Sequence, residues 1–116
     1  MDEILELATT LGKRIAADPR AKRMAEARTA FNRDPEASQL LSDYNQAQQR
    51  VHELEIQGKP VEPDDKRKLA DLHAKVTDSD TVKELMKAQM DYAALMSSVS
   101  QRIDREALGT SEDANA

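Results

Sequence analysis

The sequence predicts an all-α protein of about five helices, two of them long, which form an antiparallel helical bundle completed by self-association. Two stretches carry this prediction, roughly 35–57 and 80–107, because apolar residues recur in each at heptad spacing. The chain has only three glycines and four prolines, and all but Gly12 fall at expected helix ends. No run alternates β-branched or aromatic residues with polar ones, as a strand would.

The first helix is expected from about Asp2 to Ala17. Acidic residues near its start and basic residues near its end suit the helix dipole. Its apolar face is formed by Ile4, Ala8, Leu11 and Ile15. The second helix is expected at 19–32, because Asp18 can cap it and Pro19 fits the first helical position.

The third helix has the clearest start and stop signals. Asp34 can cap its free N–H groups, and Pro35 has no N–H to lose. At the other end, Gly58 can adopt the left-handed conformation that ends a helix, and Pro60 prevents the helix from resuming. The apolar stripe between these ends consists of Ala37, Leu40, Tyr44, Ala47, Val51 and Leu54.

Pro63 can open a fourth helix, and a break at 77–80 precedes the last one. The last helix is expected to start between Ser79 and Thr81, because Thr81 and Glu84 have capping-box spacing. We expect the two long helices to be partners, with their apolar stripes forming a self-association seam. The residues of this seam are Leu40, Tyr44, Val51, Leu54, Leu85, Gln89, Tyr92 and Met96.

Gln89 is the one amide in the seam. A polar residue at a core position can fix the register or the oligomeric state of a helical assembly. A slight rotation of the helix would instead leave Gln89 half exposed. Both interpretations stay open from the sequence.

Length and composition limit the architecture and the chemistry. A chain of 116 residues can bury one modest core, so we place a single helical domain at 1–108 and a disordered C-terminal tail at the polar residues 109–116. Cysteine is absent, which excludes disulfides, thiolate nucleophiles and cysteine-ligated clusters. The acidic N-terminus and the lack of a long apolar run predict a cytoplasmic protein without membrane insertion.

Charge is unevenly distributed along the chain. Residues 13–33 contain seven basic and two acidic groups, a net charge of +5. Because the whole chain has a net charge of −5, the other residues together carry −10. A basic run is most often a solvated helix face, but its separation from the acidic remainder suggests a binding surface. The candidate partner-binding residues are Arg20, Lys22, Arg23 and Arg28.

Catalytic and metal-binding patterns are weak. His52 and Glu55 have metal-compatible spacing on the third helix, but no matching ligand set is evident on a facing helix. His73 lies beside Asp71 without such a set. Both histidines are most simply solvated. We find no nucleophile–base set and no glycine-rich phosphate loop, and we therefore expect no enzyme, no metal and no cofactor.

Four short motifs together resemble the YlbF/YmcA family of small bacterial regulators. The motifs are Ala8-x-x-Leu11-Gly12-x-x-Ile15, Asp34-x-Glu36-Ala37-x-x-Leu40-Leu41-x-x-Tyr44, Gln57-Gly58-Lys59-Pro60 and Ala88-Gln89-x-x-Tyr92-x-x-Leu95-Met96-x-x-Val99-x-x-x-Ile103. Their order and spacing cover about residues 4–105. The resemblance implies an all-α protein with two long helices that associates with copies of itself or with relatives.

The same resemblance implies a regulatory role. Members of the family act in competence, sporulation and biofilm control, and some work in a complex that modulates the endonuclease RNase Y. Iron–sulfur clusters held by cysteines are associated with that complex, and they do not transfer to a chain without cysteine. We therefore expect a non-enzymatic regulator or adaptor acting through protein–protein contact. A small helical nucleic-acid-binding protein using the basic second helix is the alternative, and a metal-dependent bundle enzyme using His52 is a third interpretation.

Overall fold

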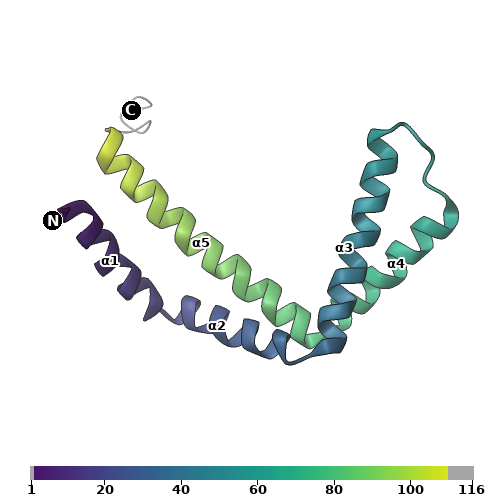
Figure 1. Ribbon diagram of the computed structural model, residues 1–116, viewed down its shortest axis with the longest axis horizontal. Helices are drawn as coiled ribbons and strands as arrows, with labels where there is room; N and C mark the ends of the chain where they lie inside the picture. The colour runs from purple at the N-terminus through teal and green to yellow at the C-terminus, as the bar shows by residue number, and fades with distance from the viewer. Residues whose placement is uncertain (1, 110–116) are drawn as a thin grey trace. The chain divides into compact units, whose positions relative to one another are not determined.

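The computed structural model describes residues 2–109, so the tail expected from 109 onward lies, apart from Gly109, outside the described residues. Residues 2–109 form five helices and no strand: α1 (Glu3–Ala16), α2 (Pro19–Asn32), α3 (Pro35–Ile56), α4 (Pro63–Asp78) and α5 (Asp80–Leu108) (Figure 1). The all-α prediction is confirmed, and both long helices begin and end within one residue of the expected bounds.

Aspartate side chains cap the first and third helices. Asp2 accepts the N–H groups of Ile4 at 3.0 Å and Leu5 at 3.4 Å. Asp34 accepts the N–H of Ala37 at 3.0 Å, with Pro35 at the start of α3. These bonds satisfy N–H groups that have no partner inside the helix, which is why an aspartate at this position favours a helix start.

Gly58 ends α3 as the sequence predicts. Its φ is +68°, in the left-handed region. The N–H of Lys59 donates to the carbonyl of Leu54 at 2.9 Å, and the N–H of Gly58 donates to the carbonyl of Glu55 at 3.1 Å. This pair of bonds is a Schellman motif, and it turns the chain out of α3 toward α4.

The junction between α4 and α5 is tighter than expected, because Ser79 alone separates the two helices. Ser79 is extended (φ −82°, ψ 115°), and its Oγ accepts the N–H of Val82 at 3.3 Å. The capping box expected at Thr81 is therefore wrong, since Thr81 already lies inside α5. Its side chain instead hydrogen-bonds Asp34, the cap of α3.

The chain divides into two compact units. Unit 2 comprises Glu26–Met86, and unit 1 comprises the residues up to Ala25 and from Lys87 onward. The core of unit 2 is built from Ala37, Val76 and Val82, one residue from each of α3, α4 and α5. Partly buried side chains of Phe31, Leu40, Leu41 and Tyr44 pack against it. The start of α5 is thus part of the hydrophobic core of unit 2.

The helix that packs along α3 in unit 2 is α4 (Figure 1). Within unit 2, α4 rather than the last helix packs along α3, and Val82 of the last helix lies in one core cluster with Ala37 of α3. The physical reason is the short connection at 57–62, which brings the chain back antiparallel beside the helix it has just left. The stripe on α3 that the sequence assigns to another long helix is therefore partly covered by α4.

In the described part of unit 1, the buried side chains are Met24 on α2 and Ala88 on α5. No residue of α1 is buried. The amphipathic pattern of α1 is present as predicted, but the chain supplies almost no cover for its apolar face.

Candidate interaction surfaces

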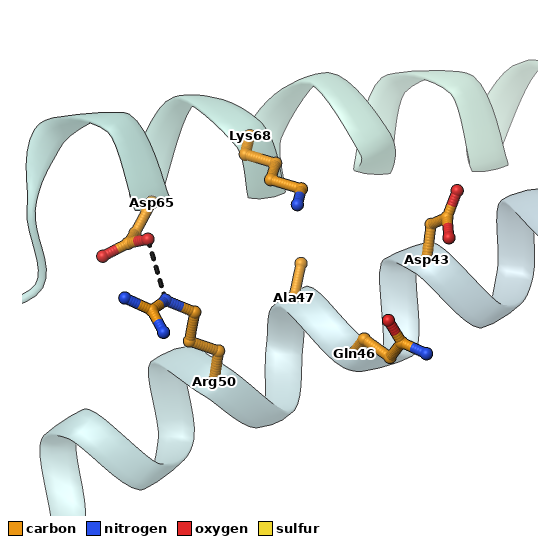
Figure 2. A pocket seen from close by; sticks show the side chains of 6 residues that line it. All are labelled: Asp43, Gln46, Ala47, Arg50, Asp65 and Lys68. Carbon is orange, nitrogen blue, oxygen red and sulfur yellow. Dashed lines mark hydrogen bonds and ion pairs between the residues drawn. The ribbon is translucent and has the colours of Figure 1, made fainter.

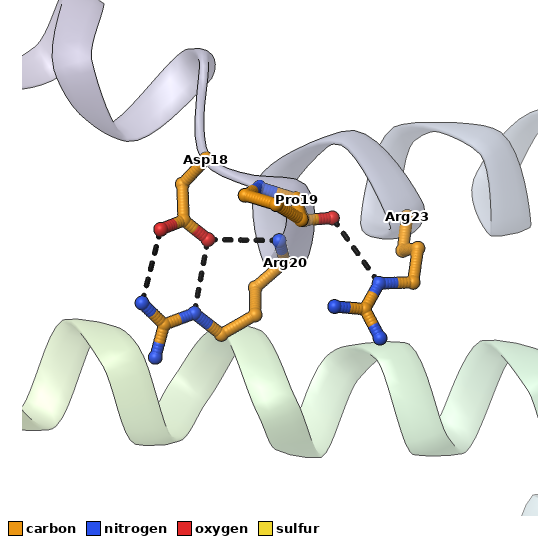
Figure 3. A network of polar contacts seen from close by, with 4 residues as sticks. All are labelled: Asp18, Pro19, Arg20 and Arg23. Atoms are coloured by element: carbon orange, nitrogen blue, oxygen red, sulfur yellow. Dashed lines mark hydrogen bonds and ion pairs between the residues drawn. The ribbon is translucent and has the colours of Figure 1, made fainter.

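Three charged side chains, Asp18, Arg20 and Arg23, make local hydrogen bonds at the start of α2 (Figure 3). Asp18 accepts the backbone N–H of Arg20 at 2.8 Å, which caps α2. The same carboxylate accepts Nε of Arg20 at 2.9 Å and its second guanidinium nitrogen at 3.0 Å. Arg23 donates from Nε to the carbonyl of Pro19 at 3.3 Å. Arg20 and Arg23 are thereby tied to the first turn of their own helix.

This network shifts the protonation of both partners. The guanidinium and the backbone N–H of Arg20 together lower the pKa of Asp18 from 3.8 to about 2. The carboxylate of Asp18, and more weakly that of Asp91 on α5, raises the pKa of Arg20. Charge-assisted, two-point hydrogen bonds of this kind favour the ionised forms of both groups. The positive charge of Arg20 is accordingly neutralised by its ion pair with Asp18.

The four predicted partner-binding residues do not form one surface. Arg20 and Arg23 are three positions apart and lie on one side of α2, whereas Lys22 is two positions from Arg20 and points roughly 200° around the helix. Lys22 and Arg28 are exposed, and among residues 2–109 the side chain of neither has a hydrogen-bond or ion-pair partner. The structure thus leaves two free cations at different azimuths rather than a continuous basic face.

The predicted seam residues differ in exposure. On α3, Leu40, Tyr44, Val51 and Leu54 are half-buried. On α5, Leu85 is buried and Tyr92 and Met96 are half-buried, but Gln89 is exposed. Ala88 occupies the buried position next to it. Gln89 therefore has no core position in the monomer, which favours the rotated-helix interpretation over a register role.

A polar groove lies between α3 and α4 (Figure 2). Asp43, Gln46, Ala47 and Arg50 line it from α3, and Asp65 and Lys68 line it from α4. Nε of Arg50 donates to Oδ1 of Asp65 at 3.0 Å, across the two helices. Its two carboxylates and two cations offset one another, so the groove does not favour an anion or a cation. Exposed ion pairs of this type stabilise weakly.

A hydrogen-bonded chain also links α3 and α4, and sequence reasoning missed it. The hydroxyl of Tyr44 lies 3.1 Å from Nδ1 of His73 and accepts the amide of Gln48 at 2.9 Å. The rings of Tyr44 and His73 are tilted at 45° with centroids 5.8 Å apart. The sequence could have predicted this contact, because Tyr44 and His73 lie at nearly equal distances in sequence from Gly58, and residues equidistant from the turn of an antiparallel hairpin lie side by side.

Metal and membrane interpretations gain no support from the described residues. His52 and Glu55 are exposed, and residues 2–109 contain no group of three or more histidine, aspartate and glutamate side chains placed to hold a metal ion. Among the five described helices, none combines the length and the apolarity that a membrane span requires.

The largest concentration of exposed apolar side chains is on α1. Ile4 is 76% exposed, Leu5 and Leu7 are each 63% exposed, and Leu11 is also exposed. Further along unit 1, α5 exposes Met90, Ile103 and Leu108. Contiguous exposed apolar residues on a helix are typical of a surface that binds another macromolecule.

Comparisons with known proteins agree on the family. Residues 4–106 match the family described as "Control of competence regulator ComK, YlbF/YmcA". A UPF0342 protein of Desulfitobacterium hafniense is 26% identical over 97 residues, covering 84% of this chain and 74% of the relative. A UPF0342 protein of Streptococcus pyogenes is 24% identical, covering 84% and 86% respectively.

A solved structure shares the fold. It is a protein of unknown function (DUF964) from Bacillus stearothermophilus, with a TM-score of 0.67 and 21% sequence identity, covering 95% of this chain and 98% of that one. The family match extends over nearly all the described residues and includes the four motifs noted above. This chain belongs to the YlbF/YmcA family of competence-control regulators.

Proposed function

We propose that this protein is a non-enzymatic regulator or adaptor that acts by binding other proteins, with the exposed apolar face of α1 as a principal contact. The observation that carries the proposal is the exposure of Ile4, Leu7 and Leu11, which share one face of a helix that buries no residue. Its family is named for control of a competence regulator, which is a regulatory role. A protein partner that covers α1 would remove this apolar surface from water, and that burial drives association.

The titration of the described residues supports a structural rather than a catalytic use of charge. Shifted pKa values often mark catalytic groups. Here the pKa of Asp18 is lowered by Arg20, and that of Asp34 is lowered by the N–H of Ala37 and the side chain of Thr81. Both aspartates cap helices, so the shifts follow from the side-chain contact with Arg20 or Thr81 together with the capping hydrogen bond.

The partners we propose are copies of this chain, other family members, or proteins of an RNA-processing or developmental complex. Nucleic acid is the alternative partner. It is the weaker candidate because Arg20 already pairs with Asp18, and because Lys22 and Arg28 are not placed with Arg23 on one side of α2. Phosphate binding by so few cations would be weak, and it would weaken further with added salt, because each neutralised phosphate releases counterions.

The test is recovery of partners from the native host by the tagged protein, with and without nuclease, in three forms: wild type, Leu7→Glu and Thr9→Glu. Leu7 lies on the apolar face with Ile4 and Leu11, whereas Thr9 lies roughly 160° around α1 from Leu7, where its hydroxyl donates to the carbonyl of Leu5. We expect the partners to survive nuclease, to be lost with Leu7→Glu and to be retained with Thr9→Glu.

The nucleic-acid alternative predicts a different outcome. Partners would disappear after nuclease treatment. Changing Arg20, Lys22, Arg23 and Arg28 together to Ser would abolish tight RNA binding, whereas Leu7→Glu would leave RNA binding unchanged. That result would overturn the adaptor proposal.

A further inference from the structure

A second groove between α3 and α4 has a partly apolar lining. It lies at the end of the hairpin where α3 begins and α4 ends, and its volume is about 610 Å³. Ala37 and Leu40 of α3 and Leu72 of α4 supply the apolar lining. Both leucines are half-buried, so part of each side chain remains in contact with water. A partner that covers them would remove this apolar surface from water, which favours binding.

The other side chains of the lining make this groove negative, and we call it the acidic groove. Its carboxylates are Asp34, Glu36, Asp43 and Asp78, and its one cation is Lys75, so four negative groups and one positive group give a net charge of −3. The ion pairs among residues 2–109 include none of these five groups. Like charges that are not compensated in one cleft attract a ligand of opposite charge.

Neither a metal ion nor the helix dipoles account for this charge. Residues 2–109 contain no group of three or more histidine, aspartate and glutamate side chains placed to hold a metal ion. The positive end of the α3 dipole lies beside the negative end of the α4 dipole in the acidic groove, so the two dipoles offset one another. The side chains therefore determine the sign of the potential, and a cationic partner is favoured.

The shape of the acidic groove indicates the form of that partner. Side chains of a third helix can fit along the groove between two packed helices. Asp34 and Asp43 are nine positions apart in sequence, which corresponds to roughly 14 Å along a helix, or about two to three turns. Because α3 and α4 already pack on each other, the acidic groove needs no ordering of this chain before a partner binds.

We propose that the acidic groove binds a basic amphipathic helix of a different protein. Apolar residues spaced by three and four on that helix contact Leu40 and Leu72. Lysine or arginine residues on either side of its apolar stripe lie against Glu36, Asp43 and Asp78. This surface is separate from the apolar face of α1, so the inference goes beyond the proposed function and does not depend on it.

The first experiment measures binding of three synthetic peptides to the full chain by fluorescence anisotropy. Each peptide has about 14 residues, near the shortest length of a stable helix. The first has a leucine stripe and lysines elsewhere, the second has the same composition with the leucines dispersed around the helix, and the third has glutamate in place of lysine. We expect a Kd of about 10–100 μM for the first, as suits a small interface, a Kd at least about fivefold higher for the second, and no binding of the third.

The second experiment removes two carboxylates from the acidic groove. Glu36→Gln and Asp78→Asn, made together, preserve side-chain size at two exposed positions, and far-UV circular dichroism checks that the fold is retained. We expect the Kd of the basic amphipathic peptide to rise about fivefold, as loss of two exposed charge pairs does. The matched control is Glu53→Gln with Glu62→Gln, which removes two exposed carboxylates at the other end of the same hairpin and should leave the Kd unchanged.

Four outcomes would overturn the inference. Equal losses in the two double variants would show that the total charge of the chain attracts the peptide, and equal binding of the dispersed-leucine peptide would leave the apolar lining without a role. Tighter binding of a peptide with the sequence of α2, the basic helix of this chain, would make a second copy the occupant. The fourth is a basic amphipathic peptide that does not bind at about 1 mM, well above the expected Kd.

The same assay separates this inference from the proposed function. Leu7→Glu changes the apolar face of α1 and should bind the basic amphipathic peptide as the wild type does. If Leu7→Glu leaves recovery of host partners unchanged, the proposed use of α1 fails and the acidic groove is unaffected. If the peptide does not bind, the acidic groove fails and the use of α1 stands.

Discussion

Val82 should be the most sensitive position in the hydrophobic core of unit 2. Its side chain is 0% exposed, and it lies in one cluster with Ala37 of α3 and Val76 of α4. Val82→Ala removes two methyl groups, each contributing about 0.8 kcal/mol, and leaves a cavity that raises the cost to about 2–3 kcal/mol. The better helix propensity of alanine returns about 0.5 kcal/mol, so we expect a net loss of about 2 kcal/mol in the free energy of unfolding.

The assay is urea unfolding followed by far-UV circular dichroism, with Val51→Ala as the matched control. Val51 is also on a helix, so the gain in propensity is the same, but its side chain is only half-buried. We expect Val51→Ala to cost about 1 kcal/mol or less, since less apolar surface is lost. Equal losses for the two variants, or a loss below about 0.5 kcal/mol for Val82→Ala, would refute the view that the start of α5 completes this core.

Two further predictions concern caps. Gly58→Ala should destabilise the protein by about 1 kcal/mol through backbone conformation alone, because φ is +68° and an added Cβ would meet no atom within 4 Å; an equal urea midpoint for the variant would contradict this. The pKa of Asp18 is lowered from 3.8 to about 2, so its ionised form favours the folded state. That contribution is present above pH 3.8 and is lost as pH falls toward 2. Asp18→Asn keeps a capping side chain but should reduce the difference between urea midpoints at pH 6 and pH 2.5; an undiminished difference would assign the acid sensitivity to other groups.

The features that sequence reasoning predicted well are those controlled by neighbouring residues. Asp34, Pro35 and Gly58 act within one helical turn, and each has the conformation and hydrogen bonds that the sequence predicts. The bounds of α3 follow from these signals, and those of α5 follow from the apolar periodicity. The family was also predictable, because its motifs consist of these same local patterns in a fixed order.

Positions along the seam were less predictable, because the buried face at the start of α5 does not follow a heptad repeat. A strict heptad places Gln89 on the same face as Val82. In the structure the buried residues of α5 are Val82, Leu85 and Ala88, spaced by three, and each such step turns the buried face by about 60°, which leaves Gln89 exposed. The cap of α5 was mispredicted because Ser79 and Thr81 are both good caps; in the structure the Oγ of Ser79 accepts the N–H of Val82, whose side chain is in the core.

The partner of α3 and the use of the basic residues depended on contacts that no local pattern specifies. The stripe on α3 suits any apolar helix, and the short connection at Gly58 gives the advantage to α4. The positive charge of Arg20 suggests a binding surface in the sequence, whereas its closeness to Asp18 turns it into part of a helix cap. A charge count cannot separate these uses, because they differ only in side-chain geometry.

Burial is distributed in a way that separates the stable part of the molecule from the part we propose to bind. Unit 2 has a core to which three helices contribute, and its α3–α4 hairpin is joined by Arg50–Asp65 and by Tyr44–His73. α1 has caps and an apolar face but no buried residue. Segments with few buried contacts open most easily, and binding elements are commonly drawn from them. A partner that orders α1 would therefore bind at little cost to the core, and binding should protect the amide hydrogens of α1 from exchange while leaving those of α3 unchanged.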